Sequence, residues 1–430
     1  MRLAYSWGSD LHTYQRGPVK PSAVLASSFL LAAAFALPAS AQTAAPVAAA
    51  APADPIAQLV SQLDLGRYKD TIRNLASFGD RKQGTERNRK AIDWIEAQLK
   101  SYGCATERIR YDYVAAPRQR VPATGGGRGG PSGQGGSTLF GTRAPTGVND
   151  DPMKQPIEAL RALNAEQPDP KGGPREEVYC TKVGSTHPEE MYIVAAHMDG
   201  LGYGEAANDD ASGTALVMEL ARILNAPGVT TGRSIRFALW NNEETGLHGA
   251  AAYVEQRKSL QGIESPKGSG RYPEPRWLGM IQHDMMMFDH GMPLPHADAS
   301  GKQVAAPSLE QRREADVNIE FQANSKQAEA SQKLAWAFRA ANDKYASDYP
   351  AAVGPHMTNT DSTPFMDLVP SISLRENERG QQIGAGWNPH WHQPTDLVST
   401  FSDKDYLLGL NAAQTTLAAV AQLAGARIEK

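Results

Sequence analysis

Four short apolar runs in the second half of the chain most constrain its fold. They are "MYIVAA", "SIRFALW", "LGMIQ" and "VPSISL". Helix-like segments or long connections separate the first three, and the helix-like stretch "ASQKLAWAFRAANDKY" precedes the fourth. Apolar strands that alternate with helices are typical of a mostly parallel, doubly wound α/β sheet flanked by helices. We therefore expect a single α/β domain.

Polar side chains follow each of these runs at the point where the strand should end. In open α/β sheets, ligands bind outside the carboxyl ends of the strands, so we expect these side chains to converge on one crevice. They are His197 and Asp199, Glu243 and Glu244, His283 and Asp284, and Arg375 and Glu376.

Two adjacent carboxylates, Asp209 and Asp210, stand between the first run and a helix-like segment, "SGTALVMELARIL". Taken alone, an aspartate at a helix start simply caps the helix and complements its dipole. A lone "HMD" or "EE" is equally uninformative. The whole set is different, because its nitrogen and oxygen donors suit two zinc-like divalent ions. In chain order it comprises His197, Asp209, Glu244, Asp284 and His392.

The order and spacing of these motifs resemble those of the M28 family of zinc peptidases, which includes bacterial aminopeptidases. The matching segments are "HMD", "NDDASG", "NNEETG", "QHDM" and "HQPTD". The resemblance covers roughly residues 67–420, apart from a Gly-rich insert. It implies the zinc-dependent exopeptidase-like version of the α/β fold and a cofactor of two Zn²⁺ ions.

The resemblance also implies a role for each residue of the site. One zinc would be held by His197, Asp209 and Asp284, and the other by Asp209, Glu244 and His392, so that Asp209 bridges the two. The peptide bond after Asp209 would be cis.

Glu243 and Asp199 would be the catalytic residues of such a site. Glu243 would take a proton from the metal-bridging water and pass it to the leaving amine. Asp199 would orient His197 through the second ring nitrogen. Neighbouring strand residues point to opposite faces, so Glu243 and Glu244 can serve one site only if the strand has already ended, and Gly246 is consistent with a turn there.

Substrate contacts are less determined by the sequence. Glu376 matches a glutamate that members of the family often carry, and it could meet the substrate's amino terminus or form a structural salt bridge. The segment "NTDSTPF" places Asp361 at the aspartate of the family's S-D-H motif, but Ser362 replaces the histidine. Some members carry a tyrosine where this chain has Met357, so His356 or zinc alone would stabilise the oxyanion.

The function expected from the resemblance is an exported dinuclear zinc aminopeptidase that hydrolyses N-terminal residues of peptides. Carboxypeptidase, amidohydrolase or glutaminyl cyclase chemistry on the same fold remains open, as does a non-catalytic binding domain. A carboxypeptidase needs a basic clamp, for which Arg375 and Arg379 are candidates. Cyclases of this type work with one zinc, and the full two-metal ligand set argues against them.

The N-terminal region is typical of an export signal. Arg16 and Lys20 precede the apolar run "AVLASSFLLAAAFAL", and "PASAQ" supplies a small-residue cleavage site after Ala41. We therefore expect a signal peptide at 1–41, a disordered Ala/Pro-rich leader at 42–55 and a peptidase domain at 56–430. The mature protein would be periplasmic or secreted, without a stable membrane span.

Net charge and cysteine content indicate the kind of partner and the compartment. A net charge of -4 gives no reason to expect nucleic acid, which leaves a peptide substrate as the expected partner. Cys104 and Cys180 would meet an oxidising compartment and could pair, although two buried free thiols remain an alternative. The segment "GGGRGGPSGQGG" marks a flexible surface insert at about 116–150.

Local sequence patterns also predict helices and strands in the first third of the domain. "TERNRKAIDWIEAQLKSYG" predicts a helix that Thr85 caps and Gly103 ends, and "TERIRYDYV" predicts a strand. A short extra helix is expected in "DPMKQPIEALRALNAEQ", followed by a strand at "EEVYCTKV".

Overall fold

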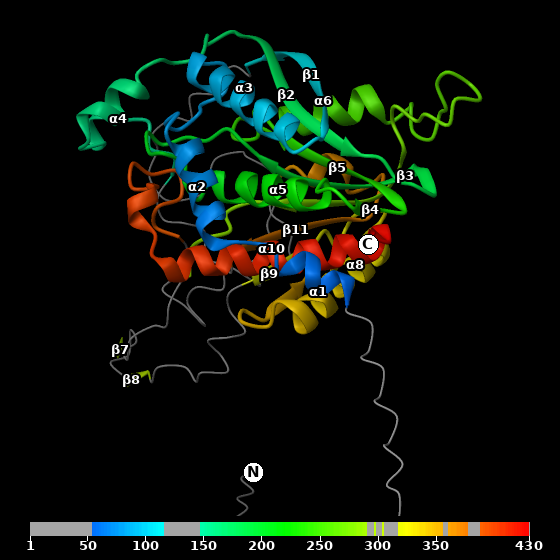
Figure 1. Cartoon of the computed structure of the whole chain (residues 1–430). Coiled ribbons are helices and arrows are strands. Elements are labelled where there is room, and N and C mark those ends of the chain that lie inside the picture. The colour runs from blue at the N-terminus through cyan, green and yellow to red at the C-terminus, as the bar shows by residue number, and fades with distance from the viewer. Residues whose placement is uncertain are drawn as a thin grey trace, which may run out of the picture. The chain divides into compact units, whose positions relative to one another are not determined.

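The four apolar runs form neighbouring parallel strands of one large sheet (Figure 1). They are β3 (His187–His197), β5 (Arg233–Trp240), β6 (Arg276–His283) and β11 (Ser371–Glu376). In the part of the chain that the structure describes, the sheet has eight strands in the order β1-β2-β5-β3-β6-β11-β9-β10. The mostly parallel α/β sheet expected from the sequence is therefore confirmed.

This computed structural model describes residues 54–115, 147–289, 317–355, 360–376 and 388–429. Between them it also gives the backbone of two short strands, β7 (His296–Ala297) and β8 (Gln303–Val304). The predicted signal peptide, most of the predicted leader and insert, and the candidate residues His356 and Arg379 lie outside the described residues. The described residues all belong to one unit, Ala53–Lys430.

The outer strands make the sheet mixed at both edges. On one side, β1 (Ala105–Val114) and β2 (Gly172–Lys182) pair antiparallel to each other, and β2 pairs antiparallel to β5. On the other side, β9 (Val317–Phe321) pairs antiparallel to β11, and β10 (Ala351–Gly354) pairs parallel to β9. A separate pair joins β4 (Val229–Thr230) to β12 (Arg427–Ile428).

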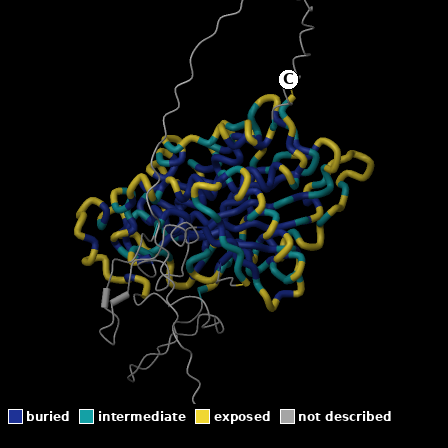
Figure 2. The backbone as a smooth tube through the Cα atoms, turned by 90° about the horizontal axis from the view of Figure 1, so that it is seen from below, coloured by how far each residue is buried: buried dark blue, intermediate teal, exposed yellow. Residues whose placement is uncertain are grey.

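Most of the helices pack against one face of the sheet, where the larger hydrophobic core lies. They are α1 (Pro55–Val60), α2 (Leu65–Ala76), α3 (Glu86–Ser101), α5 (Ala211–Leu224), α8 (Ala328–Tyr345) and α10 (Asp403–Ala424). A smaller core covers the other face, with α6 (His248–Arg257). Alternate residues of β3 serve the two cores, Val194 and Ala196 one and Ile193 and Ala195 the other, because strand side chains alternate in direction. Buried residues accordingly occupy the centre of the unit (Figure 2).

The structure also confirms the helix boundaries that the sequence predicted at Thr85 and Gly103, in the first third of the domain. Thr85 caps α3 by accepting a hydrogen bond from the Asn88 N–H, and Gly103 adopts a positive φ of 76° just beyond the helix end. The expected extra helix is shorter than its apolar pattern, comprising η1 (Pro152–Lys154) and α4 (Glu158–Leu163). Two further short 3-10 turns are η2 (Thr363–Phe365) and η3 (Val398–Thr400). Asp54 caps α1, so helical structure begins slightly before the expected domain boundary.

Cys104 and Cys180 form a disulfide, with a Cα–Cα distance of 5.7 Å. The bond joins the residue before β1 to β2, which lie side by side in the sheet. Of the two alternatives that the sequence left open, the structure therefore shows the paired one.

Helix α10 is the one described helix that is long and apolar enough to cross a membrane. Of its apolar window, 78% is buried inside the fold. A core helix of a globular protein meets the same criteria of length and composition, and α10 packs against α5 and α8 in the larger core.

Candidate metal centre

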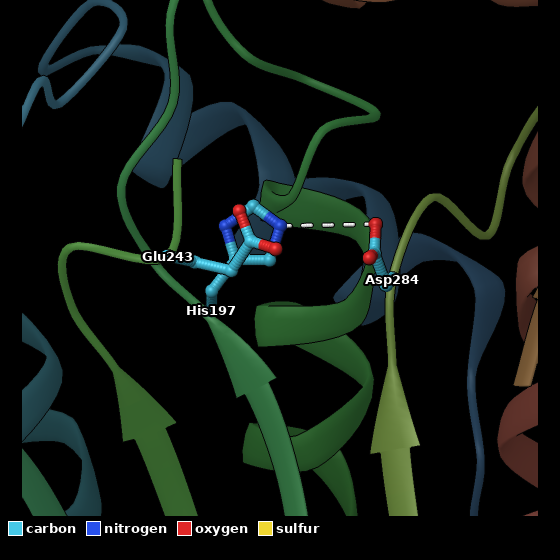
Figure 3. A group of neighbouring side chains, drawn as sticks. All are labelled: His197, Glu243 and Asp284. Carbon is cyan, nitrogen blue, oxygen red and sulfur yellow. Dashed lines mark ion pairs between the residues drawn. The ribbon is translucent and has the colours of Figure 1, made fainter. Parts of the chain in front are cut away.

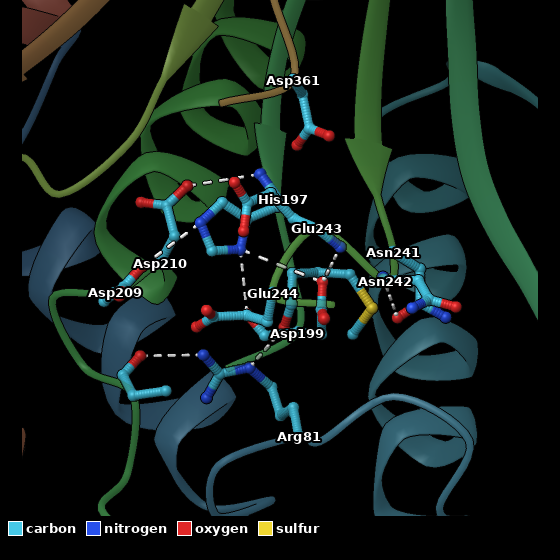
Figure 4. Close-up of polar contacts among 12 residues, drawn as sticks. Arg81, His197, Asp199, Asp209, Asp210, Asn241, Asn242, Glu243, Glu244 and Asp361 are labelled. Atoms are coloured by element: carbon cyan, nitrogen blue, oxygen red, sulfur yellow. Dashed lines mark hydrogen bonds and ion pairs between the residues drawn. The ribbon is translucent and has the colours of Figure 1, made fainter. Parts of the chain in front are cut away.

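The carboxyl ends of three parallel strands gather histidine and carboxylate side chains at one edge of the sheet (Figure 4). His197 is the last residue of β3, Asp284 follows β6, and Glu243 and Glu244 follow β5. Asp209 comes just before α5, and His392 lies in the loop that precedes α10. The five predicted metal ligands and Glu243 are therefore brought together from separate parts of the chain.

Two groups of three side chains have a geometry that could hold a metal ion. One comprises His197, Glu243 and Asp284 (Figure 3). The other comprises Asp209, Glu244 and His392. Within each group, one ligand atom per residue lies within 4.8 Å of the others.

Asp209 joins the two groups. Its Oδ1 lies 3.2 Å from His197 Nε2, and its Oδ2 lies 3.0 Å from His392 Nε2. Glu244 Oε2 lies 2.7 Å from the same atom of His392. Each oxygen of Asp209 thus faces a different histidine, which is the arrangement that a bridging carboxylate requires. The peptide bond between Asp209 and Asp210 is cis, as expected.

Asp210 binds backbone N–H groups, unlike the adjacent Asp209. Its side chain accepts hydrogen bonds from the N–H groups of Gly213 at 2.9 Å, Met285 at 3.2 Å and His197 at 3.3 Å. It therefore caps α5 and ties the start of that helix to the ends of β3 and β6. Of the two adjacent carboxylates, one faces the histidines and the other holds the backbone.

The expected contact between Asp199 and His197 is present, but through the main chain. His197 Nδ1 donates to the backbone carbonyl of Asp199 at 3.0 Å, whereas the Asp199 carboxylate lies 3.9 Å from this nitrogen. This hydrogen bond leaves Nε2 directed at the carboxylates. The Asp199 carboxylate instead accepts the Glu243 N–H at 3.1 Å, so it fixes the loop that carries Glu243.

The chain turns immediately after β5, which lets Glu243 and Glu244 reach the same centre. The strand ends at Trp240, and Asn242, Gly246 and Leu247 have positive φ values of 68°, 129° and 62°. These left-handed conformations break the alternation of a strand. The side chain of Glu244 is only 3% exposed, although its backbone lies nearer the surface.

Glu376 is occupied by contacts within the protein. Its oxygens accept hydrogen bonds from Asn208 Nδ2 at 2.9 Å, Phe288 N at 2.6 Å and Asn388 Nδ2 at 3.0 Å. Burial raises its pKa well above the usual range. Its described partners are neutral amides and not a cation, so the expected structural salt bridge needs correction: Glu376 links three loops around the centre. Its contact with a substrate's amino terminus stays a prediction.

The remaining candidate residues that the structure describes are in contact with other parts of the protein. Arg375 pairs with Asp284, and Asp361 is fully buried near Glu243. His283 donates from Nδ1 to the Ala195 carbonyl and accepts from Thr416 Oγ1 at Nε2, so it is a satisfied core histidine. His390 contacts Thr395 at 2.9 Å.

The acidic surroundings of the centre control its protonation. Burial disfavours the charged form of His392, but Glu244 and Asp209 outweigh it and raise its pKa to about 10. Burial raises the pKa of Glu244 to about 7. Burial also opposes the ionised form of Asp209, yet His197 and His392 hold its pKa below the usual range. In the metal-free centre His392 therefore carries a proton at neutral pH. Burial also disfavours the charged form of His197, but Glu243, Asp209 and Asp284 outweigh it and raise the pKa of His197 well above its usual value.

The side chains present fit a pair of metal ions. Buried carboxylates are stable only when paired or bound to a cation, and this edge of the sheet gathers several of them. Glu244 Oε1 is buried and makes no hydrogen bond within the described residues. The mixed imidazole and carboxylate donors suit zinc.

Three residues that support the centre were not singled out from the sequence. Arg81, Asn88 and Asn241 are buried polar residues next to the loops that carry the histidines and carboxylates. Asp396, which the "HQPTD" motif did include, accepts hydrogen bonds from the N–H groups of Asn208 at 2.8 Å and Asp209 at 3.1 Å. An isolated arginine or asparagine in a polar segment is usually exposed, so the sequence carried no signal for the first three.

The fold and the site together define an α/β protein with a candidate metal centre at the carboxyl edge of its parallel strands. The chain belongs to peptidase family M28, because the model of that family matches residues 177–414, more than half of the chain.

Individual relatives agree with this family. Carboxypeptidase Q of Xenopus laevis is 35% identical over 83 residues, which cover 19% of this chain and 18% of that protein. A probable lipoprotein aminopeptidase, LpqL of Mycobacterium tuberculosis, is 35% identical over 131 residues, which cover 30% and 24%. The chain thus matches less than a quarter of the length of these curated relatives.

Solved structures show the same fold. An aminopeptidase from Aneurinibacillus sp. strain AM-1 superposes with a TM-score of 0.54 at 18% sequence identity. The superposition covers 87% of this chain and 97% of that one.

Proposed function

We propose that this protein is an exported dinuclear zinc aminopeptidase that removes N-terminal residues from peptides. The observation that carries the proposal is the position of Asp209, whose two oxygens face His197 and His392 at 3.2 and 3.0 Å. Asp284 and Glu244 supply the remaining carboxylate ligands, one in each group, and Glu243 lies beside His197 and Asp284 as the base. When bound, two zinc ions would polarise the scissile carbonyl and lower the pKa of the attacking water.

Glu243 is the residue suited to move the proton. Its carboxylate lies in the group formed with His197 and Asp284, and its backbone is fixed by Asp199. Burial raises the pKa of Glu243 well above the usual range, and Asp361 and Glu244 add to this effect against the opposing influence of His197. A carboxylate with a raised pKa accepts a proton more readily, as a general base must, and can then deliver it to the leaving amine.

The contacts of Arg375 bear on the choice between a free amino terminus and a free carboxylate. Four carboxylates surround the two histidines, and two bound zinc ions would offset their charge, so the choice depends on whether a basic clamp is available. Arg375, one of the two clamps considered for a carboxypeptidase, is buried and paired with Asp284 at 2.9 Å. Arg375 could therefore act as a clamp only by breaking this ion pair.

Two of the other functions have specific objections. A one-zinc glutaminyl cyclase does not need both groups of ligands. A non-catalytic binding domain has no need for Glu243 beside a complete ligand set. Carboxypeptidase activity is the main alternative, because a carboxypeptidase is among the relatives.

Hydrolysis of aminoacyl-p-nitroanilides, free and N-acetylated, tests the proposal directly. The purified mature protein should cleave the free substrates and leave the acetylated ones intact. Glu243→Gln should lose this activity while retaining two zinc ions per chain. Cleavage of N-blocked dipeptides with a free carboxylate, without activity on the free nitroanilides, would instead establish the carboxypeptidase.

Export is supported by the signal-like N-terminal region and by the Cys104–Cys180 disulfide, since disulfides persist in oxidising compartments. Cell fractionation and N-terminal sequencing test this part. A periplasmic or extracellular protein that begins at Gln42 is expected, and a cytoplasmic protein that begins near Met1 would contradict it.

A further inference from the structure

Arg81 is a fully buried arginine outside the part of the chain that the family model matches. It lies in the connection between α2 and α3, with a positive φ of 51°. Burying a guanidinium is costly unless all of its donors are satisfied. The partners of Arg81 therefore indicate why a charged side chain is kept there.

Within the described residues, the donors of Arg81 face backbone carbonyls only. Nε donates to Met198 at 2.8 Å, Nη2 donates to Ala206 at 2.8 Å, and Nη1 donates to Glu205 at 2.8 Å. Nη1 also lies within reach of Gly79 and Leu75, at 3.0 and 3.3 Å. One planar group thus spans carbonyls from two separate loops and from its own turn.

The two loops are those that carry the metal-facing residues. Met198 directly follows His197, and its backbone also continues the sheet by donating to Trp240. Glu205 and Ala206 precede Asp209, and the Ala206 carbonyl accepts the N–H of Ala211, the first residue of α5. By bonding both loops, the guanidinium fixes the distance between the segment that holds His197 and the segment that holds Asp209.

Asn88 of α3 holds Arg81 in place and extends the network to a third loop. Its Nδ2 donates to the Arg81 carbonyl at 2.8 Å and to Asn241 Oδ1 at 3.0 Å. Asn241 Nδ2 donates back to Asn88 Oδ1 at 3.1 Å. Asn241 lies two residues before Glu243, so the same network reaches the loop of the proposed base.

Only arginine has this set of donors. Its five N–H groups lie in a fixed plane, whereas lysine concentrates three donors on one atom and cannot reach Met198, Glu205 and Ala206 together. The positive charge also lies near Asp396, Asp210 and Asp199, so it offsets part of the buried acidity of the centre.

We propose that Arg81, held by Asn88, is a positioning residue that sets the spacing of the His197 and Asp209 loops and thereby the affinity of the metal centre. This inference rests on the proposed two-zinc function and names a residue on which that function depends. Among the described residues, the Arg81 guanidinium donates to backbone carbonyls and to none of the proposed ligand atoms, so it acts through the backbone.

Zinc affinity, measured by competition with a chromophoric chelator, tests the inference without using peptidase activity. The variants are Arg81→Lys and, as a matched control, Arg236→Lys. Arg236 is also buried, but it pairs with Glu274 and Tyr253 in the smaller core, where Glu274 precedes β6 at the amino-terminal end of that strand. Thermal unfolding of both variants in EDTA reports the loss of stability that any buried arginine replacement causes.

We expect Arg81→Lys to raise the zinc dissociation constant by about 10- to 100-fold, the range typical of residues that orient metal ligands. Arg236→Lys should lower the unfolding temperature in EDTA by a comparable amount and change the zinc dissociation constant less than about twofold, because it touches neither loop. Equal zinc affinity in the wild type and in Arg81→Lys would overturn the inference.

Asn88→Ala provides a second test, which applies even if Arg81→Lys does not fold. Removing the amide frees the Arg81 main chain and the Asn241 loop, so zinc affinity should fall by a smaller factor, about 3- to 10-fold. Unchanged affinity in this variant would also overturn the inference. If the wild type binds no zinc, the proposed metal centre itself is wrong. If the wild type binds zinc and the variants bind it with the same affinity, only the role of Arg81 is wrong.

Discussion

Arg375 and Asp284 form a buried ion pair, with Arg375 Nη2 2.9 Å from Asp284 Oδ2. Both side chains are almost fully buried, at 6% and 5% exposure. The other oxygen of Asp284, Oδ1, lies 3.7 Å from His197 Nε2. Asp284 therefore divides its carboxylate between the centre and Arg375, which leaves one oxygen for a metal ion.

This pair predicts the behaviour of Arg375→Met. Removing one partner of a buried ion pair leaves an uncompensated charge, which typically costs about 3–5 kcal/mol of unfolding free energy. We expect a loss of this size in EDTA and a smaller loss with saturating zinc, because a bound cation would compensate Asp284. Urea unfolding with and without zinc measures both. An equal loss under the two conditions would mean that Asp284 does not contact the metal.

Asp209→Asn and Glu244→Gln should differ in the number of metal ions lost. Asp209 faces both histidines, whereas Glu244 faces only His392, at 2.7 Å. An amide offers one weaker oxygen ligand, so Asp209→Asn should weaken both sites and Glu244→Gln only one. After dialysis, elemental analysis should find close to no zinc in the first variant and about one ion per chain in the second. The same stoichiometry in both variants would show that Asp209 does not bridge.

Zinc binding should release protons and tighten as the pH rises. In the metal-free centre the pKa of His392 is about 10 and that of Glu244 about 7. The pKa of His197 is raised as well, so zinc must displace protons from the two histidines and, below about pH 7, also from Glu244; affinity should therefore increase with pH. Calorimetric titrations in buffers of different ionisation enthalpy count the released protons. Affinity that falls between pH 6 and 8 would contradict this assignment.

Removing the disulfide should lower the stability of the protein and leave its activity unchanged. Cys104 and Cys180 are separated by 76 residues, and a cross-link across a loop of this size contributes roughly 4 kcal/mol in the chain-entropy model. Cys104→Ser with Cys180→Ser should lower the free energy of unfolding by up to this amount. Neither residue touches the centre, so kcat and zinc content should stay at wild-type values. Parallel denaturant unfolding and activity assays of this double variant check both statements.

The main ligands of the centre could be placed from the sequence because of one property of α/β sheets. Parallel strands end at the same edge, so polar residues just after β3, β5 and β6 must meet there, whatever the connections between them. This rule alone places His197, Glu243, Glu244 and Asp284 at one edge, whereas their separate roles as ligands or base came from the resemblance to the family. Asp209 and His392 lie in loops, and only the order of motifs shared with the family assigned them.

Details that depend on backbone direction could not be read from spacing. Whether Asp199 offers its carboxylate or its carbonyl to His197 depends on the turn after β3, and a two-residue spacing allows both. Glu376 could not be assigned either, because its partners Asn208, Phe288 and Asn388 come from three loops. The antiparallel pairing of β9 with β11 was also missed, since a short strand has no pattern that reveals its direction.

The two histidines of the centre come from opposite ends of the matched region, since His197 ends β3 and His392 lies just before the last long helix, α10. Helix α10 in turn packs in the larger core against α5, the helix that Asp209 precedes. A ribosome must therefore synthesise everything from β3 to the loop before α10 before the second histidine can join the first. Throughout that part of its synthesis, the chain has no complete centre.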